Sequence, residues 1–134
     1  MNNHWSASYV GLPWRDRGRE PSGVDCWGLV RLALQECAGI ETPSYDEGYT
    51  SVAELREVAG LFSNTRRRPW LWVELGQERE FDMILLGRRS VDYHCGIVVE
   101  RGLMLHVEEG SRARIEPYSA FRNISGIYRH EALL

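Results

Sequence analysis

A strong net charge and a long apolar segment are both missing from this chain of 134 residues. The formal net charge is −3, so no large basic field is available for binding nucleic acid or a membrane surface. No stretch approaches the roughly 18 apolar residues that a transmembrane helix requires. The first residues lack a basic segment followed by an apolar one, so we expect synthesis in a cytoplasm without a Sec signal peptide.

Cysteine is also scarce. The chain has three cysteines and no C-x-x-C pair. A disulfide framework cannot use an odd number of cysteines completely, and the missing pair argues against a structural zinc site. We therefore expect neither a metal nor a cofactor.

The length and the ordinary composition, 43% hydrophobic and 26% charged, predict a single domain over residues 1–134. Helical patterns occupy the first half of the chain, with a loop rich in glycine and proline at 11–23. The expected helices are 4–10, 26–38 and 51–62. The second half reads as short strands, at 70–75, 83–87, 94–100, 103–107, 114–118 and 126–130. Helices followed by consecutive strands predict an α+β fold with an antiparallel sheet.

The helix predicted at 26–38 begins with a cysteine. Asp25 is a good N-cap and Gly39 a good C-terminal stop. The N-terminus of a helix favours a thiolate, so Cys26 is a candidate nucleophile. Its position equally allows a small apolar residue that begins the buried face. Cys37, in the last turn, and Cys95, inside a strand, are interpreted as packing residues.

Two histidines are candidates for the base that a thiol nucleophile needs. His94 and His106 lie on adjacent predicted strands joined by a two-residue turn at 101–102. A regular hairpin around that turn places His106 opposite Ile97, three positions along the ladder from His94. A bulge or a longer loop would bring the two histidines closer.

The segments "DCWGLV" and "HCGIVVERGLMLHV" resemble the NlpC family of papain-like cell-wall cysteine peptidases. The similarity extends to "EFDMILLG" and covers about residues 9–128. It implies a papain-like fold with N-terminal helices packed on an antiparallel sheet. In that fold Cys26 would be the nucleophile at a helix N-terminus, His94 the base and His106 the residue that orients it.

The resemblance also implies a substrate and a reaction. The expected substrate is a stem peptide of bacterial peptidoglycan, cut after γ-D-glutamate through a thioester acyl-enzyme. Candidate oxyanion or substrate-binding residues are Trp14, Asp25, Trp27 and Gly96. Trp14 stands where the family commonly has tyrosine, and Trp27 where many members have serine.

The segments "YVGLPW" and "DCWGLV" look most like the short members found in bacteriophage and prophage tails. We therefore expect a protein carried in a virion tail to the cell wall, with other tail proteins as partners. Two alternatives remain open. The first is a catalytically silent tail-tip structural protein with the same fold. The second is a zinc site formed by Cys26, His94 and His106, although no acidic base is evident beside it.

Overall fold

The computed structural model describes residues 4–42, 69–88, 91–121 and 123–134. The predicted helix at 51–62 lies outside these residues. The elements follow in the order η1 (Trp5–Ser8), β1 (Arg19–Glu20), β2 (Gly23–Val24), α1 (Cys26–Ala38), β3 (Trp70–Val73), β4 (Met83–Arg88), β5 (Val91–Glu100), β6 (Leu103–His106), β7 (Arg114–Pro117), η2 (Tyr118–Ala120), β8 (Ile124–His130) and η3 (Glu131–Leu133). None of the helices in this part of the chain has the length and apolar character needed to cross a bilayer.

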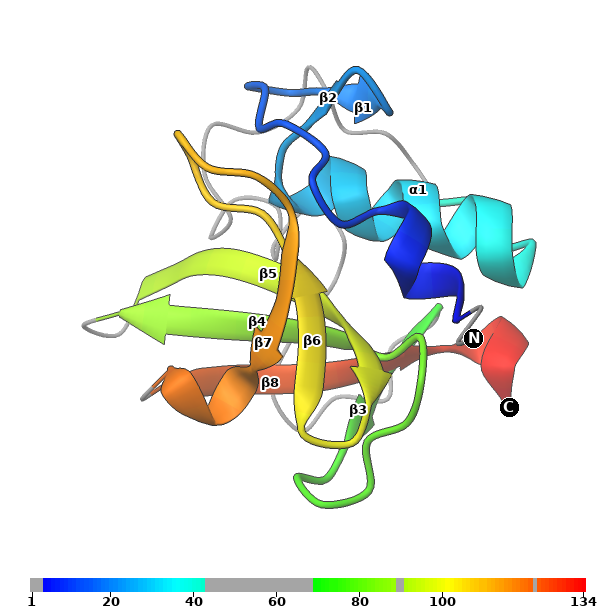
Figure 1. The fold of residues 1–134 in the computed structure, drawn as a ribbon. Helices are drawn as coiled ribbons and strands as arrows, with labels where there is room; N and C mark the ends of the chain where they lie inside the picture. Colours follow the sequence, from blue (N-terminus) through cyan, green and yellow to red (C-terminus); the bar gives the residue numbers. More distant parts are fainter. Residues whose placement is uncertain (1–3, 43–68, 89–90, 122) are drawn as a thin grey trace.

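The six longer strands form one antiparallel sheet in the order β3-β8-β4-β5-β6-β7. Helix α1 lies across one face of this sheet (Figure 1) and packs against β5. Alternate strand residues form a core beneath α1, and the residues between them form a second cluster on the opposite face. All six predicted strands are present, and the α+β expectation is confirmed.

Helix α1 begins and ends where its capping residues predict. The Asp25 side chain accepts a hydrogen bond from the Gly28 amide at 2.7 Å, and Gly39 ends the helix in the left-handed region with φ 68°. A side chain is excluded at Gly28, because an added Cβ would lie 1.9 Å from the Gly18 carbonyl oxygen. The first turn of α1 is therefore held directly against the backbone of the preceding loop.

The Gly28→Ala variant is expected to lose about 3 kcal/mol of unfolding free energy, because two backbones must separate. This corresponds to a fall of roughly 10 °C in Tm. Gly76→Ala is the control, since its added Cβ meets nothing within 4 Å and only the φ of +100° is strained. That strain is about 1 kcal/mol. Equal Tm losses for the two variants would contradict the tight contact at Gly28.

The β5–β6 hairpin departs from regular pairing by one residue. Glu100 pairs with Leu103 across the predicted two-residue turn, but Ile97 pairs with Leu105, so the register shifts at Val99. Continuing the shifted register places His106 opposite Gly96 rather than Ile97. Because side chains alternate between faces, this single-residue bulge places His94 and His106 on the same face of the sheet.

Two predictions for the N-terminal segment need correction. The expected helix at 4–10 is only a 3₁₀ turn, Trp5–Ser8, in which the Tyr9 amide bonds to the Ser6 carbonyl three residues back. Gly11, with φ 96°, turns the chain immediately afterwards. The antiparallel ribbon of β1 and β2 begins inside the expected loop at 11–23 and ends one residue beyond it, at Val24. Such short elements depend on contacts with the rest of the chain rather than on local periodicity.

Candidate active site

Cys26 is the first residue of α1, and its side chain is partly buried. The ribbon of β1 and β2 lies at this end of the helix (Figure 1). The Gly28 amide donates to the Asp25 side chain, and the first amides of any helix have no carbonyl partner within that helix. The N-terminus of α1 therefore carries a partial positive charge close to the Cys26 thiol.

A short backbone strap, residues 11–14, connects the helix start to the far strands of the sheet. On one side the Val24 amide donates to the Pro13 carbonyl at 3.0 Å, two residues before Cys26. On the other side the Trp14 amide donates to the Ser111 carbonyl at 3.2 Å. The strap thereby holds the β6–β7 connection close to the segment that leads into α1.

The two predicted histidines are in direct contact. His94 Nε2 lies 2.7 Å from His106 Nδ1, and both rings are buried. Phe121 packs against both rings, with centroid distances of 6.1 Å to His94 and 5.5 Å to His106. Because Nε2 of His94 is engaged with His106, Nδ1 is the nitrogen of His94 that remains for Cys26.

Cys26 is held as a thiolate. A hydrogen bond from Cys95 contributes most to lowering its pKa to about 5, ahead of the hydrogen bond and positive charge of His94. These effects outweigh burial and the negative charge of Asp25, both of which raise the pKa. Arg19 Nη1 offsets the Asp25 charge through an ion pair of 2.7 Å. The hydrogen bond to Cys26, together with burial, raises the pKa of Cys95 well above its ordinary value.

Alkylation of Cys26 by iodoacetamide is expected to rise between about pH 4 and pH 6 and then level off, because the thiolate is the reactive form. Cys95→Ala removes the main hydrogen-bond donor, so its profile should move to higher pH. Peptide mapping of the adducts at each pH measures both effects. The assignment is contradicted if Cys37 or Cys95 reacts before Cys26, or if Cys95→Ala leaves the profile unchanged.

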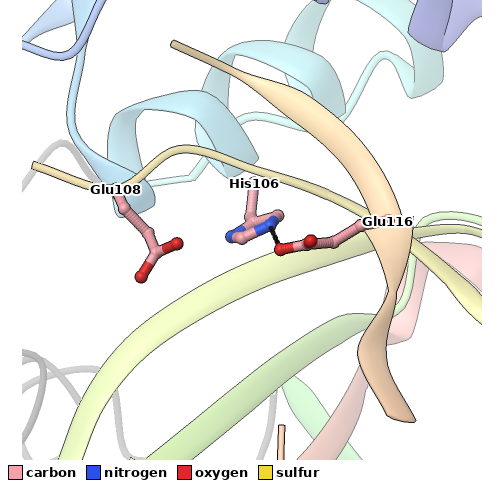
Figure 2. Close-up of side chains that lie close together, drawn as sticks. All are labelled: His106, Glu108 and Glu116. Atoms are coloured by element: carbon pink, nitrogen blue, oxygen red, sulfur yellow. Dashed lines mark hydrogen bonds and ion pairs between the residues drawn. The ribbon is translucent and has the colours of Figure 1, made fainter. Parts of the chain in front are cut away.

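His106 forms a second hydrogen bond, which leads away from His94. Its Nε2 lies 2.6 Å from Glu116 Oε1, and its ring is fully buried. A dashed line in Figure 2 marks this contact. Burial and the positive charge of His94 lower the pKa of His106 to about 4, although Glu116 acts in the opposite direction. His106 is therefore neutral at physiological pH.

Arg114 forms ion pairs with two acidic residues near His106. Its Nη2 lies 2.5 Å from Glu108 and 3.2 Å from Glu116. One donor atom from each of His106, Glu108 and Glu116 lies within 4.8 Å of the others, a spacing compatible with a metal ion. In this structure, however, the Arg114 guanidinium group forms ion pairs with both carboxylates.

Two of the predicted substrate-binding residues, Trp27 and Asp25, have buried side chains. The Trp27 side chain is fully buried, and its ring packs edge-on against Trp70 at 6.4 Å. The Trp27 side chain therefore belongs to the core, and a contact with substrate through its backbone stays a prediction. Asp25 is also buried, and its Oδ1 accepts from both Gly28 and Arg19 at 2.7 Å. The Asp25 side chain therefore caps α1.

The other two candidates lie near the site. Trp14 is partly buried, and its backbone bridges Val24, two residues before Cys26. An added Cβ at Gly96 would lie 3.2 Å from His106 Cβ and 3.1 Å from the Leu105 carbonyl oxygen. The missing side chain at Gly96 therefore lets His106 pack closely against β5.

Sequence reasoning missed several partners of the predicted residues. Cys95 was interpreted as packing only, although it also bonds to Cys26. Glu116 was not singled out at all. A signal for it exists in "RIE", where polar side chains alternate with Ile115 beside the strand of His106. A thiolate followed by two hydrogen-bonded histidines is an arrangement suited to nucleophilic attack on a carbonyl group.

Comparisons with solved structures show the same fold. The NlpC/p60 domain of peptidoglycan hydrolase SagA matches with a TM-score of 0.64 and 19% identity over 92% of each chain. An NlpC/P60 family protein from Bacillus cereus ATCC 10987 matches with a TM-score of 0.68 and 17% identity, over 93% of this chain and 37% of its own. NlpC2 from Trichomonas vaginalis matches with a TM-score of 0.67 and 17% identity, over 94% and 43%.

The chain thus spans less than half of the length of the Bacillus and Trichomonas proteins. None of the curated proteins compared with it matches. The sequence model of the NlpC/P60 family matches residues 11–125, which include α1, the histidine pair and most of the sheet. The chain therefore belongs to the NlpC/P60 family.

Proposed function

We propose that this protein is a cysteine peptidase that hydrolyses peptide bonds in bacterial peptidoglycan. The observation that carries the proposal is the series of hydrogen-bonded rings, His94 Nε2 to His106 Nδ1 at 2.7 Å, beside a thiol whose pKa is lowered to about 5. Membership of the NlpC/P60 family and the similarity to a domain of a peptidoglycan hydrolase support the choice of substrate.

The proposed reaction begins with attack of the Cys26 thiolate on the scissile carbonyl carbon. The amide of Cys26, at the start of α1, stabilises the resulting oxyanion. Collapse breaks the C–N bond, and protonated His94 gives its proton to the leaving amine. His94 then takes a proton from water, which attacks the thioester and releases the acid product and the Cys26 thiolate. His106 keeps the His94 ring in position throughout.

Incubation with purified peptidoglycan, followed by mass spectrometry of the soluble fragments, tests the proposal. We expect new fragments that end at γ-D-glutamate, in line with the family resemblance. We expect a chelator to leave this activity unchanged, since the proposed mechanism needs no metal. Absence of fragments from a folded protein whose Cys26 still alkylates would contradict the proposed peptidase activity and favour a silent structural role.

We further propose that a bacteriophage or prophage tail carries the protein to the cell wall. The segments "YVGLPW" and "DCWGLV" support this through their similarity to short tail members of the family. Proteomic analysis of purified virions tests it. We expect to find the protein among the tail proteins. Its absence from virions produced by a lysogen that expresses the protein would contradict the proposal.

A further inference from the structure

The histidine pair is extended by a carboxylate on the neighbouring strand. His106 stands between His94 on β5 and Glu116 on β7, with 2.7 Å to the first and 2.6 Å to the second. Figure 2 shows Glu116 directed at the His106 ring from β7. The His106 side chain is fully buried and that of Glu116 is 28% exposed, so this hydrogen bond closes the series at the protein surface.

The chemistry of these groups determines where the protons lie. A carboxylate accepts hydrogen bonds but cannot donate them, so Nε2 of His106 must carry the proton. A neutral imidazole has only one N–H, and Nδ1 of His106 is therefore an acceptor. It can accept only from Nε2–H of His94, which in turn leaves Nδ1 of His94 for Cys26. The Glu116 carboxylate thus determines which ring nitrogens of both histidines donate and which accept hydrogen bonds.

The structure holds Glu116 firmly in this role. Its Oε1 accepts from His106 Nε2 at 2.6 Å and from Arg114 Nη2 at 3.2 Å. Arg114 also binds Glu108, which does not share a hydrogen bond with either histidine in the described part of the chain. Glu108 therefore provides a natural comparison, because it lies in the same charge cluster without the same contact.

We propose that Glu116 is a positioning residue, which fixes His106 as the Nε2–H tautomer and thereby aims Nδ1 of His94 at Cys26. The inference rests on the proposed peptidase function, but the tautomer of His106 can be measured without any turnover. It extends the predicted set of three residues to a series of four. Cys26 lies on α1, and the other three lie on the adjacent strands β5, β6 and β7. A metal ion at His106, Glu108 and Glu116 is the competing interpretation, and the Arg114 ion pairs weigh against it.

Long-range ¹⁵N–¹H spectra of the histidine rings test the tautomer directly. The wild-type protein at neutral pH should show His106 with a protonated Nε2 and an unprotonated Nδ1. Glu116→Ala should lose this single tautomer. Glu116→Gln should keep it, since the amide oxygen can occupy the place of Oε1 and accept from both His106 and Arg114. Glu108→Gln and the exposed Glu109→Gln are matched controls, in which the tautomer should not change.

The same variants are expected to rank in the same way in their kinetics as in their His106 tautomers. Glu116→Ala should lower kcat about 10–100-fold with little change in KM, by analogy with the loss typical when the carboxylate that orients a metal-binding histidine is removed. Glu116→Gln, Glu108→Gln and Glu109→Gln should remain close to wild type. Circular dichroism and Tm of each variant separate this effect from unfolding.

Three results would overturn the inference. The first is a wild-type His106 protonated at Nδ1. The second is an unchanged single tautomer in Glu116→Ala. The third is loss of activity in both Glu116→Gln and Glu108→Gln together with sensitivity to a chelator, which would establish the metal site instead. Failure of the proposed function is distinguishable, because it would abolish turnover in the wild type and leave the expected tautomers intact.

Discussion

Replacing Cys26 with alanine is expected to abolish the release of peptidoglycan fragments, lowering kcat/KM by at least about 10⁴-fold. The thiolate is the only group in the proposed mechanism that forms a bond to the substrate. Cys26→Ser should be nearly as inactive, because a serine hydroxyl does not ionise under conditions in which this thiol does.

Cys37→Ala is the matched control for this substitution. Cys37 lies near the end of the same helix, and its Sγ is 3.3 Å from the Tyr9 hydroxyl. Its removal should leave turnover close to that of the wild type. Fragment release is measured by mass spectrometry after Tm confirms that each variant is folded. Turnover that persists in Cys26→Ala would rule out Cys26 as the nucleophile.

The second large effect separates the two histidines. His94→Ala should lower kcat/KM by about 10²–10⁴-fold, because proton transfer to and from the reacting groups is lost. His106→Gln should keep measurable turnover, since an amide can still accept from His94 Nε2–H and donate to Glu116. His106→Ala should fall between the two.

One muropeptide substrate and one pH suffice to compare these variants. The assigned roles would be reversed if His106→Gln were as inactive as His94→Ala while His94→Gln retained activity. Equal losses in all variants, accompanied by a large fall in Tm, would instead point to a shared packing role for the buried pair.

Local signals in the sequence were enough to predict α1 and the strands. Asp25 and Gly39 cap the helix through contacts with their own neighbours in the chain, so their effect can be recognised without a structure. The strands around the histidines are apolar runs separated by turn residues, and this pattern too can be recognised without a structure. The placement of Cys26 at a helix N-terminus came from these signals.

The remaining features depend on register and on contacts between distant segments. The bulge at Val99 decides whether His94 and His106 share a face, and no local pattern identifies it. The burial of Trp27 against Trp70 arises from packing between α1 and the sheet, which no local pattern specifies. The contact between Glu116 and His106 likewise follows from the pairing of β6 with β7.

The strap of residues 11–14 has a consequence for how this protein can vary during evolution. It joins the segment before Cys26 to the segment before Arg114, so the two halves of the site are spaced by backbone hydrogen bonds. An insertion in the strap would shift one half relative to the other. Insertions should instead be tolerated at the exposed turn around Leu75, which is 69% exposed. Homologues are thus expected to differ in length at that turn and to keep the length of the strap.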